Sequence, residues 1–156
     1  MPRRNQPEKR IIPPDVRFDS TEVQLFINYV MRNGKKSNAT RMVYDAIDLI
    51  EERTKRSGIE VFEEALRKVA PAMEVKPRRV GGATYQVPME VPPHRRFALA
   101  SRWILAAARS RGGRNFSEKL AGELIDASNE TGAAIRKRDE THKMAEANRA
   151  FSHYRF

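Results

Sequence analysis

Arginine and lysine side chains are concentrated in one stretch of this chain, between Lys76 and Arg114. That stretch contains nine basic residues and a single acid, Glu90, so it carries +8 of the net charge of +10 on the 156 residues. The nine are Lys76, Arg78, Arg79, Arg95, Arg96, Arg102, Arg109, Arg111 and Arg114. A focused positive field attracts polyanions, and a guanidinium group binds phosphate through paired hydrogen bonds. The pattern therefore predicts a surface that binds the phosphate backbone of a nucleic acid.

The first part of this stretch has the pattern of a β-hairpin. Apolar residues alternate on both sides of Gly81-Gly82, which predicts two strands over about residues 73–91. Each strand contains a proline, Pro77 or Pro88, and a proline is confined to edge strands because it has no N–H to donate. We therefore expect a free-standing two-stranded ribbon. An isolated ribbon is only marginally stable in water, which favours a binding role over ordinary solvated charge.

The tip of the predicted ribbon forms a narrow basic finger. A two-residue loop would mix polar and apolar side chains on each face, so we predict a three-residue loop or a bulge. That loop would pair Val75 with Met89 and Arg79 with Tyr85. The Tyr85 ring can either stack on a base or cover the root of the ribbon. A finger of this kind can enter a groove or lie along a strand of nucleic acid. Its basic residues are Lys76, Arg78 and Arg79.

A helix that is apolar over most of its circumference follows the ribbon and is expected to run through the core. Prolines at its start suit a first turn, and a pair of glycines ends it at residue 112. Arg95, Arg102 and Arg109 are spaced seven apart, which places them on one line along the helix. One arginine on a buried helix is often part of an ion pair, but three in line, with hardly any acids nearby, have no obvious internal partners. Their neighbours Arg96, Arg111 and Arg114 extend the predicted binding surface.

Helical periodicity predicts five further helices. The first has a capping box at Asp19 and Glu22, and the second is expected to be capped by Ser37. The others are expected to end before residue 71, at residue 132, and near residue 149. Residues 45–64 carry seven acids against three bases, a net charge of −4, so we expect this face to point away from a polyanion. These elements predict one mainly α domain over residues 18–156, with about six helices and a protruding two-stranded β-ribbon.

The segment before this domain, residues 1–17, contains four prolines, five basic residues and two acids. Such a segment cannot bury enough surface to fold alone. A frayed terminus is the ordinary interpretation. The positive charge and the pair Ile11-Ile12 favour instead an extended basic arm that docks on nucleic acid and on its own domain. Its expected contacts are Arg3, Arg4 and Arg10.

The sequence offers little support for catalysis. The absence of cysteine excludes disulfides and thiolate chemistry. His94, His142 and His153 are too scattered for a metal motif, and no phosphate-binding or dinucleotide loop is present. We therefore predict no enzyme activity, no metal and no cofactor. No apolar run reaches the ~20 residues that cross a bilayer, and the start has no secretory pattern, so we expect a soluble cytoplasmic protein without membrane contact.

The choice between RNA and DNA depends on how many basic elements the chain has. Lys35-Lys36, on a short connector between two helices, adds to the arm, the ribbon, the arginine helix and the loop at residues 111–114. Several separate basic elements suit an irregular, folded RNA that is recognised by its shape. The alternative is an architectural DNA-binding protein with a basic β-ribbon arm, a class that is usually dimeric and reaches into the minor groove.

Three short motifs are spread along almost the full length of the chain. They are GKK at residues 34–36, followed by Met42-Val43 and Ala46, EVKPRRVGGATYQVP at residues 74–88, and MAEANRAFSHYR at residues 144–155. In this order they resemble the small-subunit ribosomal protein seven family in its bacterial form. The resemblance implies about six helices with a β-ribbon.

The same resemblance implies a role. It implies a primary binder of small-subunit ribosomal RNA that nucleates folding of the subunit head, near the messenger RNA exit channel and the exit-site transfer RNA. It also implies neighbours among the small-subunit ribosomal proteins numbered nine and eleven. The ribosomal RNA role is implied for Lys35, Lys36, Lys76, Arg78, Arg79, Arg95 and Arg102. Proximity to transfer and messenger RNA is implied for Arg79, Val80, Gly81, Gly82, Tyr85 and, on the last helix, Lys143.

Overall fold

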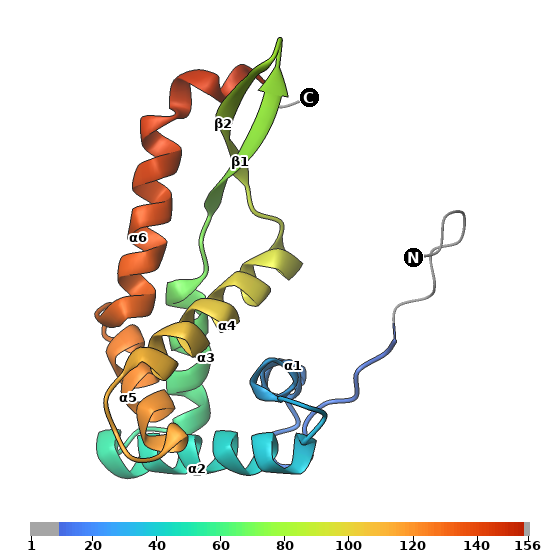
Figure 1. Ribbon diagram of the computed structural model, residues 1–156. Coiled ribbons are helices and arrows are strands. Elements are labelled where there is room, and N and C mark those ends of the chain that lie inside the picture. Colours follow the sequence, from blue (N-terminus) through green and yellow to red (C-terminus); the bar gives the residue numbers. More distant parts are fainter. Residues whose placement is uncertain (1–9, 155–156) are drawn as a thin grey trace.

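The computed structural model describes residues 10–154, which form six α-helices, one two-stranded antiparallel sheet and a short 3-10 helix (Figure 1). The prediction of a mainly α domain of about six helices with a β-ribbon is confirmed. The elements are α1 (Thr21–Val30), α2 (Lys36–Thr54), α3 (Gly58–Val69), β1 (Met73–Val80), β2 (Ala83–Glu90), α4 (Pro93–Ser110), α5 (Phe116–Ser128), α6 (Gly132–Ala147) and η1 (Arg149–Tyr154).

The core lies between the helices, each of which turns an apolar stripe inward. Phe26 of α1 and Phe62 of α3 are fully buried and meet edge to face, with ring centroids 5.1 Å apart. Ile104 of α4 and Leu124 of α5 are also fully buried. The predicted path of α4 through the core is confirmed, because it packs against α1, α3, α5 and α6. Burial of this stripe explains why the periodicity of the sequence was a good guide to the helices.

Both predicted helix caps are wrong. Asp19 does not cap α1, because its backbone lies in the left-handed region at φ 47° and its N–H donates to the carbonyl of Asp15. The carboxylate of Asp15 organises this turn by accepting hydrogen bonds from the N–H groups of Arg17 and Phe18. An Asx-type turn around Asp15 therefore replaces the capping box. Ser37 lies inside α2, whose N-cap is Lys35.

The segment before α1 is tied to the body at a few points. The Tyr44 hydroxyl donates to the buried Asp15 carboxylate at 2.7 Å, and Arg17 forms a bidentate ion pair with Asp48 at 2.6 and 3.0 Å. Before this anchor, residues 10–14 lead away from the helices (Figure 1). Arg10 is exposed, whereas Arg3 and Arg4 lie outside the described residues.

The predicted loop of the ribbon is also wrong. The strands are joined by a two-residue turn at Gly81-Gly82, so Val75 pairs with Pro88 and Lys76 with Val87. Both glycines have positive φ, 59° and 89°, which is the geometry of the hairpin turns whose twist matches that of the flanking strands. The turn geometry therefore outweighs the separation of polar and apolar faces.

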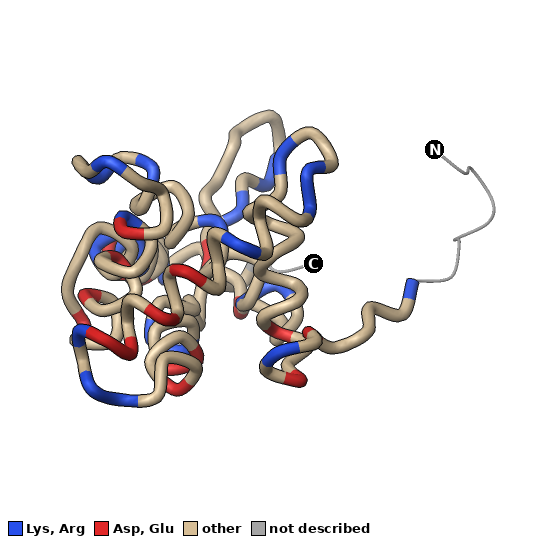
Figure 2. Tube along the Cα trace, turned by 90° about the horizontal axis from the view of Figure 1, so that it is seen from below, with Lys and Arg blue, Asp and Glu red and all other residues tan. Residues whose placement is uncertain are grey.

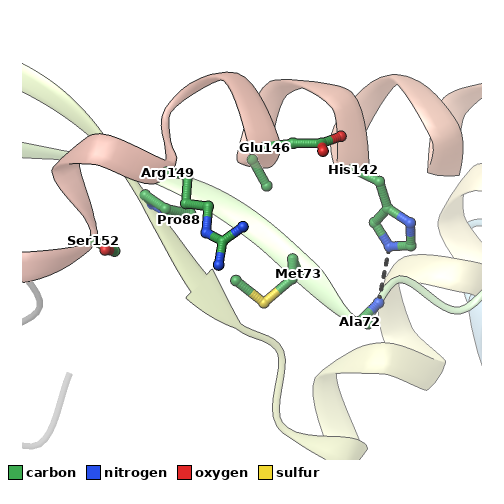
Figure 3. Close-up of a pocket in the computed structure, with 8 residues that line it drawn as sticks. Ala72, Met73, Pro88, His142, Glu146, Arg149 and Ser152 are labelled. Atoms are coloured by element: carbon green, nitrogen blue, oxygen red, sulfur yellow. Dashed lines mark hydrogen bonds between the residues drawn. The ribbon is translucent and has the colours of Figure 1, made fainter.

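The ribbon is two-stranded, as predicted, but it is not free-standing. Its strands lie against α6 and η1 (Figure 3). The N–H of Ala72 donates to Nε2 of His142 at 3.1 Å, and the rings of Tyr85 and Phe151 lie 5.3 Å apart. Val87 is fully buried, and Pro88 is buried beside it. The C-terminal elements therefore support the ribbon from its root at Ala72 as far as Tyr85, and its turn projects beyond them (Figure 1).

Candidate nucleic-acid interface

The tip of the ribbon presents two arginines to solvent. Arg78 pairs across the ribbon with Tyr85, and Arg79 pairs with Thr84. Both arginine side chains are exposed, and neither has a carboxylate partner within residues 10–154. Gly81 and Gly82 at the turn are exposed, and an added Cβ at either would meet no atom within 4 Å. The tip is therefore a slender basic surface, with room for a close approach to its backbone.

The root of the ribbon is held by an ion pair that the sequence did not suggest. Arg95 of α4 binds the carboxylate of Glu74 through two hydrogen bonds, at 2.8 and 3.0 Å, and Lys76 lies 3.3 Å from the same carboxylate. Glu74 is only 8% exposed. Burial alone would raise the pKa of Glu74, but the hydrogen bonds and charges of Arg95 and Lys76 outweigh it, so the pKa is lowered. Arg95 therefore has a structural partner.

Two more of the predicted arginines are also paired. Arg96 donates to the carbonyl of Val91 and to Glu90, and Arg111 binds both Glu123 and Asp126 at 2.6 Å. The expectation that these side chains have no internal partners is wrong for Arg95, Arg96 and Arg111. The acids that pair with Arg111 come 12 and 15 residues later in the chain, so inspection of the arginine segment alone misses them.

The remaining arginines of this segment differ from these. In the part of the chain that the structure describes, Arg102, Arg109 and Arg114 are exposed and have no carboxylate partner. Arg102 and Arg109 are on α4, and Arg114 is on the loop before α5. Three of the six arginines between residues 95 and 114 therefore retain a full positive charge for an external ligand.

The end of α4 faces the start of α2 across a hollow of about 300 Å³. Its lining includes Arg32 and Lys35 from the connector between α1 and α2, and Arg109 from α4. Burial, and then the neighbouring charge of Arg32, lower the pKa of Arg109. Two basic elements that the sequence suggested separately, the connector and the arginine helix, thus meet at one site. Lys36 is exposed at the first position of α2.

Charge is divided along α2. Figure 2 looks onto this helix and shows basic segments at its start and just beyond its end, with acidic segments between them. The acidic middle includes Asp45 and Asp48, and Asp48 is already paired with Arg17. The first turn of α2, beside the hollow, is therefore basic, whereas the middle of the helix is acidic.

Similarity to known proteins identifies the family of this chain. A family model described as "Ribosomal protein S7p/S5e" matches residues 2–149. The chain belongs to this ribosomal protein family. It is 58% identical over 156 residues to the small ribosomal subunit protein uS7 of Thermomicrobium roseum, and 59% identical over 156 residues to that of Acaryochloris marina, with all of both chains covered in each case. It is 58% identical to the protein of the same name from Chloroflexus aurantiacus, over 99% of this chain and 98% of the relative.

Membership of the ribosomal protein family identifies the chain as a structural, non-enzymatic constituent of the small ribosomal subunit. Within residues 10–154, no three or more potential ligand side chains are grouped so that they could hold a metal ion. None of the helices described is long and apolar enough to cross a membrane.

The residues predicted from the sequence to lie near transfer RNA and messenger RNA are on the ribbon and on α6. Lys143 is exposed, and Tyr85 is half-buried with its ring against Phe151 of η1, near the turn and away from the root of the ribbon. Val80 ends β1.

Among the polar and aromatic residues that line the hollow, sequence reasoning missed Arg32, Asn38 and Phe116. Arg32 stands only three residues before Lys35, so the basic cluster was visible in the sequence. Asn38 and Phe116 carried no signal, because their positions near Arg109 depend on how α2, α4 and α5 pack.

Proposed function

We propose that this ribosomal protein binds small-subunit ribosomal RNA directly, as a primary binder that helps to nucleate folding of the subunit head. The observation that carries the proposal is a group of cations on the α1–α2 connector, the ribbon tip, α4 and the loop after it, which are exposed and have no carboxylate partner in residues 10–154. They are Arg32, Lys35, Arg78, Arg79, Arg102, Arg109 and Arg114. Such charges repel one another in the free protein, and closely spaced phosphates neutralise them.

The mechanism is scaffolding. Phosphates that repel one another keep RNA helices apart, and cations on several elements of one rigid body allow those helices to converge. Each neutralised phosphate releases counterions, so log K falls by roughly 0.7–0.9 per contact for each tenfold rise in salt concentration. The basic arm, with Arg3, Arg4 and Arg10, and the cations at Lys36, Lys76, Arg95, Arg96 and Arg111 add to this field even where an acid neutralises part of their charge.

The ribbon tip has a second proposed role. Residues 79–82 and Lys143 are assigned to the neighbourhood of exit-site transfer RNA and messenger RNA, and the ribosomal proteins numbered nine and eleven are the proposed protein neighbours. The family resemblance supports this assignment, as does a tip that projects beyond the helices (Figure 1). Removal of residues 79–83 is expected to spare affinity for the ribosomal RNA fragment and to weaken exit-site transfer RNA binding on assembled subunits. Loss of all RNA affinity would contradict this division.

The direct test measures binding of the full chain to a fragment of head-domain ribosomal RNA, in competition with duplex DNA, at two salt concentrations. We expect RNA binding that survives excess DNA and has a steep salt slope. Arg102→Glu is expected to weaken binding, whereas its control Arg53→Glu, an exposed site in the last turn of α2, is not. Equal affinity for RNA and DNA would overturn the proposal and favour an architectural DNA-binding protein.

A further inference from the structure

The hollow between α2 and α4 combines two kinds of lining. Its polar rim carries Arg32, Lys35, Asn38 and Arg109, all exposed. Its apolar wall includes Met42 and Phe116, both half-buried. A volume of about 300 Å³ lies at the lower end of the range for small-molecule sites. The hollow is therefore larger than a site for an ion alone needs to be.

The charges around the hollow are uncompensated. Three cations border it, no acid lines it, and no hydrogen bond or ion pair is made by the side chains of Arg32, Lys35 or Arg109 to any residue in the range 10–154. Arg32 and Arg109 are close enough for the charge of one to lower the pKa of the other. Like charges held together in this way are stabilised by an anion, and a phosphate accepts hydrogen bonds from several guanidinium groups at once.

The apolar wall distinguishes a nucleotide from a bare phosphate. A phosphate gains nothing from Met42 and Phe116, whereas a nucleobase can lie against a ring and an aliphatic side chain. Asn38 stands on the same rim, and its amide has both a donor and an acceptor without a partner in the described chain. That combination matches the polar edge of a base.

We propose that this hollow takes up one unstacked nucleotide of the bound RNA. The base lies against Phe116 and Met42, Asn38 hydrogen-bonds to the base edge, and Arg109 contacts the attached phosphate together with Arg32 and Lys35. This inference rests on the proposed RNA-binding function and adds a defined ligand to it. It gives the protein a contact that depends on one extruded base, beside many contacts that depend only on charge.

The test uses the full chain, the head-domain RNA fragment and chemical probing of unpaired bases. Wild-type protein is expected to protect the base edge of one unpaired nucleotide. Asn38→Ala should restore its reactivity and weaken binding roughly fivefold without changing the salt slope, because a base contact and not a phosphate contact is lost. An abasic residue at that nucleotide should weaken wild-type binding by more than this factor, because it removes the stacking on Phe116 and Met42 as well as the hydrogen bond to Asn38. It should weaken the Asn38→Ala variant by a smaller factor than wild type, because that variant has already lost the hydrogen bond.

Two further variants separate the contribution of the aromatic ring from that of charge. Phe116→Leu retains an apolar side chain but removes the ring, and circular dichroism and thermal melting establish that it folds. Arg102→Gln, on α4 but not among the lining residues, is the charge control, and it should change the salt slope without affecting the protected base.

Two outcomes would overturn the inference. In the first, Arg109→Gln weakens binding while Asn38→Ala, Phe116→Leu and the abasic RNA have no effect, so that only phosphate is bound. In the second, no base is protected although the RNA binds tightly. A wild-type chain that fails to bind the RNA at all would instead overturn the proposed function.

Discussion

Arg95 and Arg109 are at the two ends of α4 and lie on the same face of the helix, but Arg95 has an acidic neighbour and Arg109 a basic one. Arg95, in the first turn of α4, binds the buried carboxylate of Glu74 and holds the root of the ribbon. Arg109, in the last turn, has no acidic partner among the described residues and faces the positive charge of Arg32. Stability depends on the first contact. The second arrangement costs stability in the free protein and gains it only with an anion.

The basic segment between residues 76 and 114 therefore contains two populations of arginine. Paired arginines such as Arg95 and Arg111 join elements of the fold, whereas unpaired arginines such as Arg102 and Arg109 remain available for RNA. Mutations should separate the two populations, because one set changes the free energy of unfolding and the other changes affinity for RNA.

The largest expected effect on stability is at Arg111. Arg111→Ala leaves the carboxylate of Glu123, which is 1% exposed, with the N–H of Ala134 as its one remaining partner among residues 10–154. We expect the free energy of unfolding to fall by about 3 kcal/mol, measured by chemical denaturation. Arg114→Ala, at an exposed arginine three residues later, should change it by less than about 0.5 kcal/mol. Equal changes in the free energy of unfolding for the two substitutions would show that paired and unpaired arginines do not differ in their contribution to stability.

A smaller loss of stability is expected at Arg95, where Lys76 remains as a partner for Glu74. Arg95→Ala should lower the free energy of unfolding by about 2 kcal/mol, a value reduced from that of a fully buried pair because the arginine is partly exposed. Hydrogen exchange should localise the change to β1, β2 and the start of α4. An unchanged ribbon would show that α6 and η1 hold it without this ion pair.

The reverse pattern is expected at Arg109. Arg109→Glu should weaken binding to the head-domain RNA fragment about tenfold, equivalent to about 1.4 kcal/mol, in a fluorescence anisotropy titration. The free energy of unfolding should change by less than about 0.5 kcal/mol, since the new carboxylate faces Arg32 and Lys35 at an exposed site. If Arg109→Glu lowered the free energy of unfolding and left affinity for the RNA fragment unchanged, Arg109 would have a structural role like that of Arg95 and Arg111.

The smallest effect concerns acid stability. The folded-state pKa of Glu74 is lowered, so its ion pair contributes stability above the unfolded pKa of about 4.3 and loses it as pH falls through the folded value. The difference in unfolding free energy between wild type and Glu74→Gln should therefore be constant from about pH 7 to pH 5. It should shrink by about 1 kcal/mol below about pH 4. A difference that persists to low pH would mean that charge does not hold the root of the ribbon.

The helices and the site were predictable to different extents. Apolar spacing identified the helices and the ribbon because a helix or strand must bury one face. Burial of one face requires apolar residues every three or four positions in a helix and every two in a strand. Details decided by competing local contacts were predicted wrongly. The turn at Asp15 displaced the cap at Asp19, and two glycines with positive φ selected a shorter loop than the apolar pattern favoured.

By itself, the sequence determined that this protein has a helical body, a basic ribbon and an excess of positive charge between residues 76 and 114. Those properties depend on composition and on spacing within one element. Only the tertiary structure decided which charges are available, because Glu74, Glu123 and Asp126 reach their arginines through packing between elements. The meeting of Arg32, Lys35 and Arg109 around one hollow has the same origin, since contacts distant along the chain leave no periodic trace in the sequence.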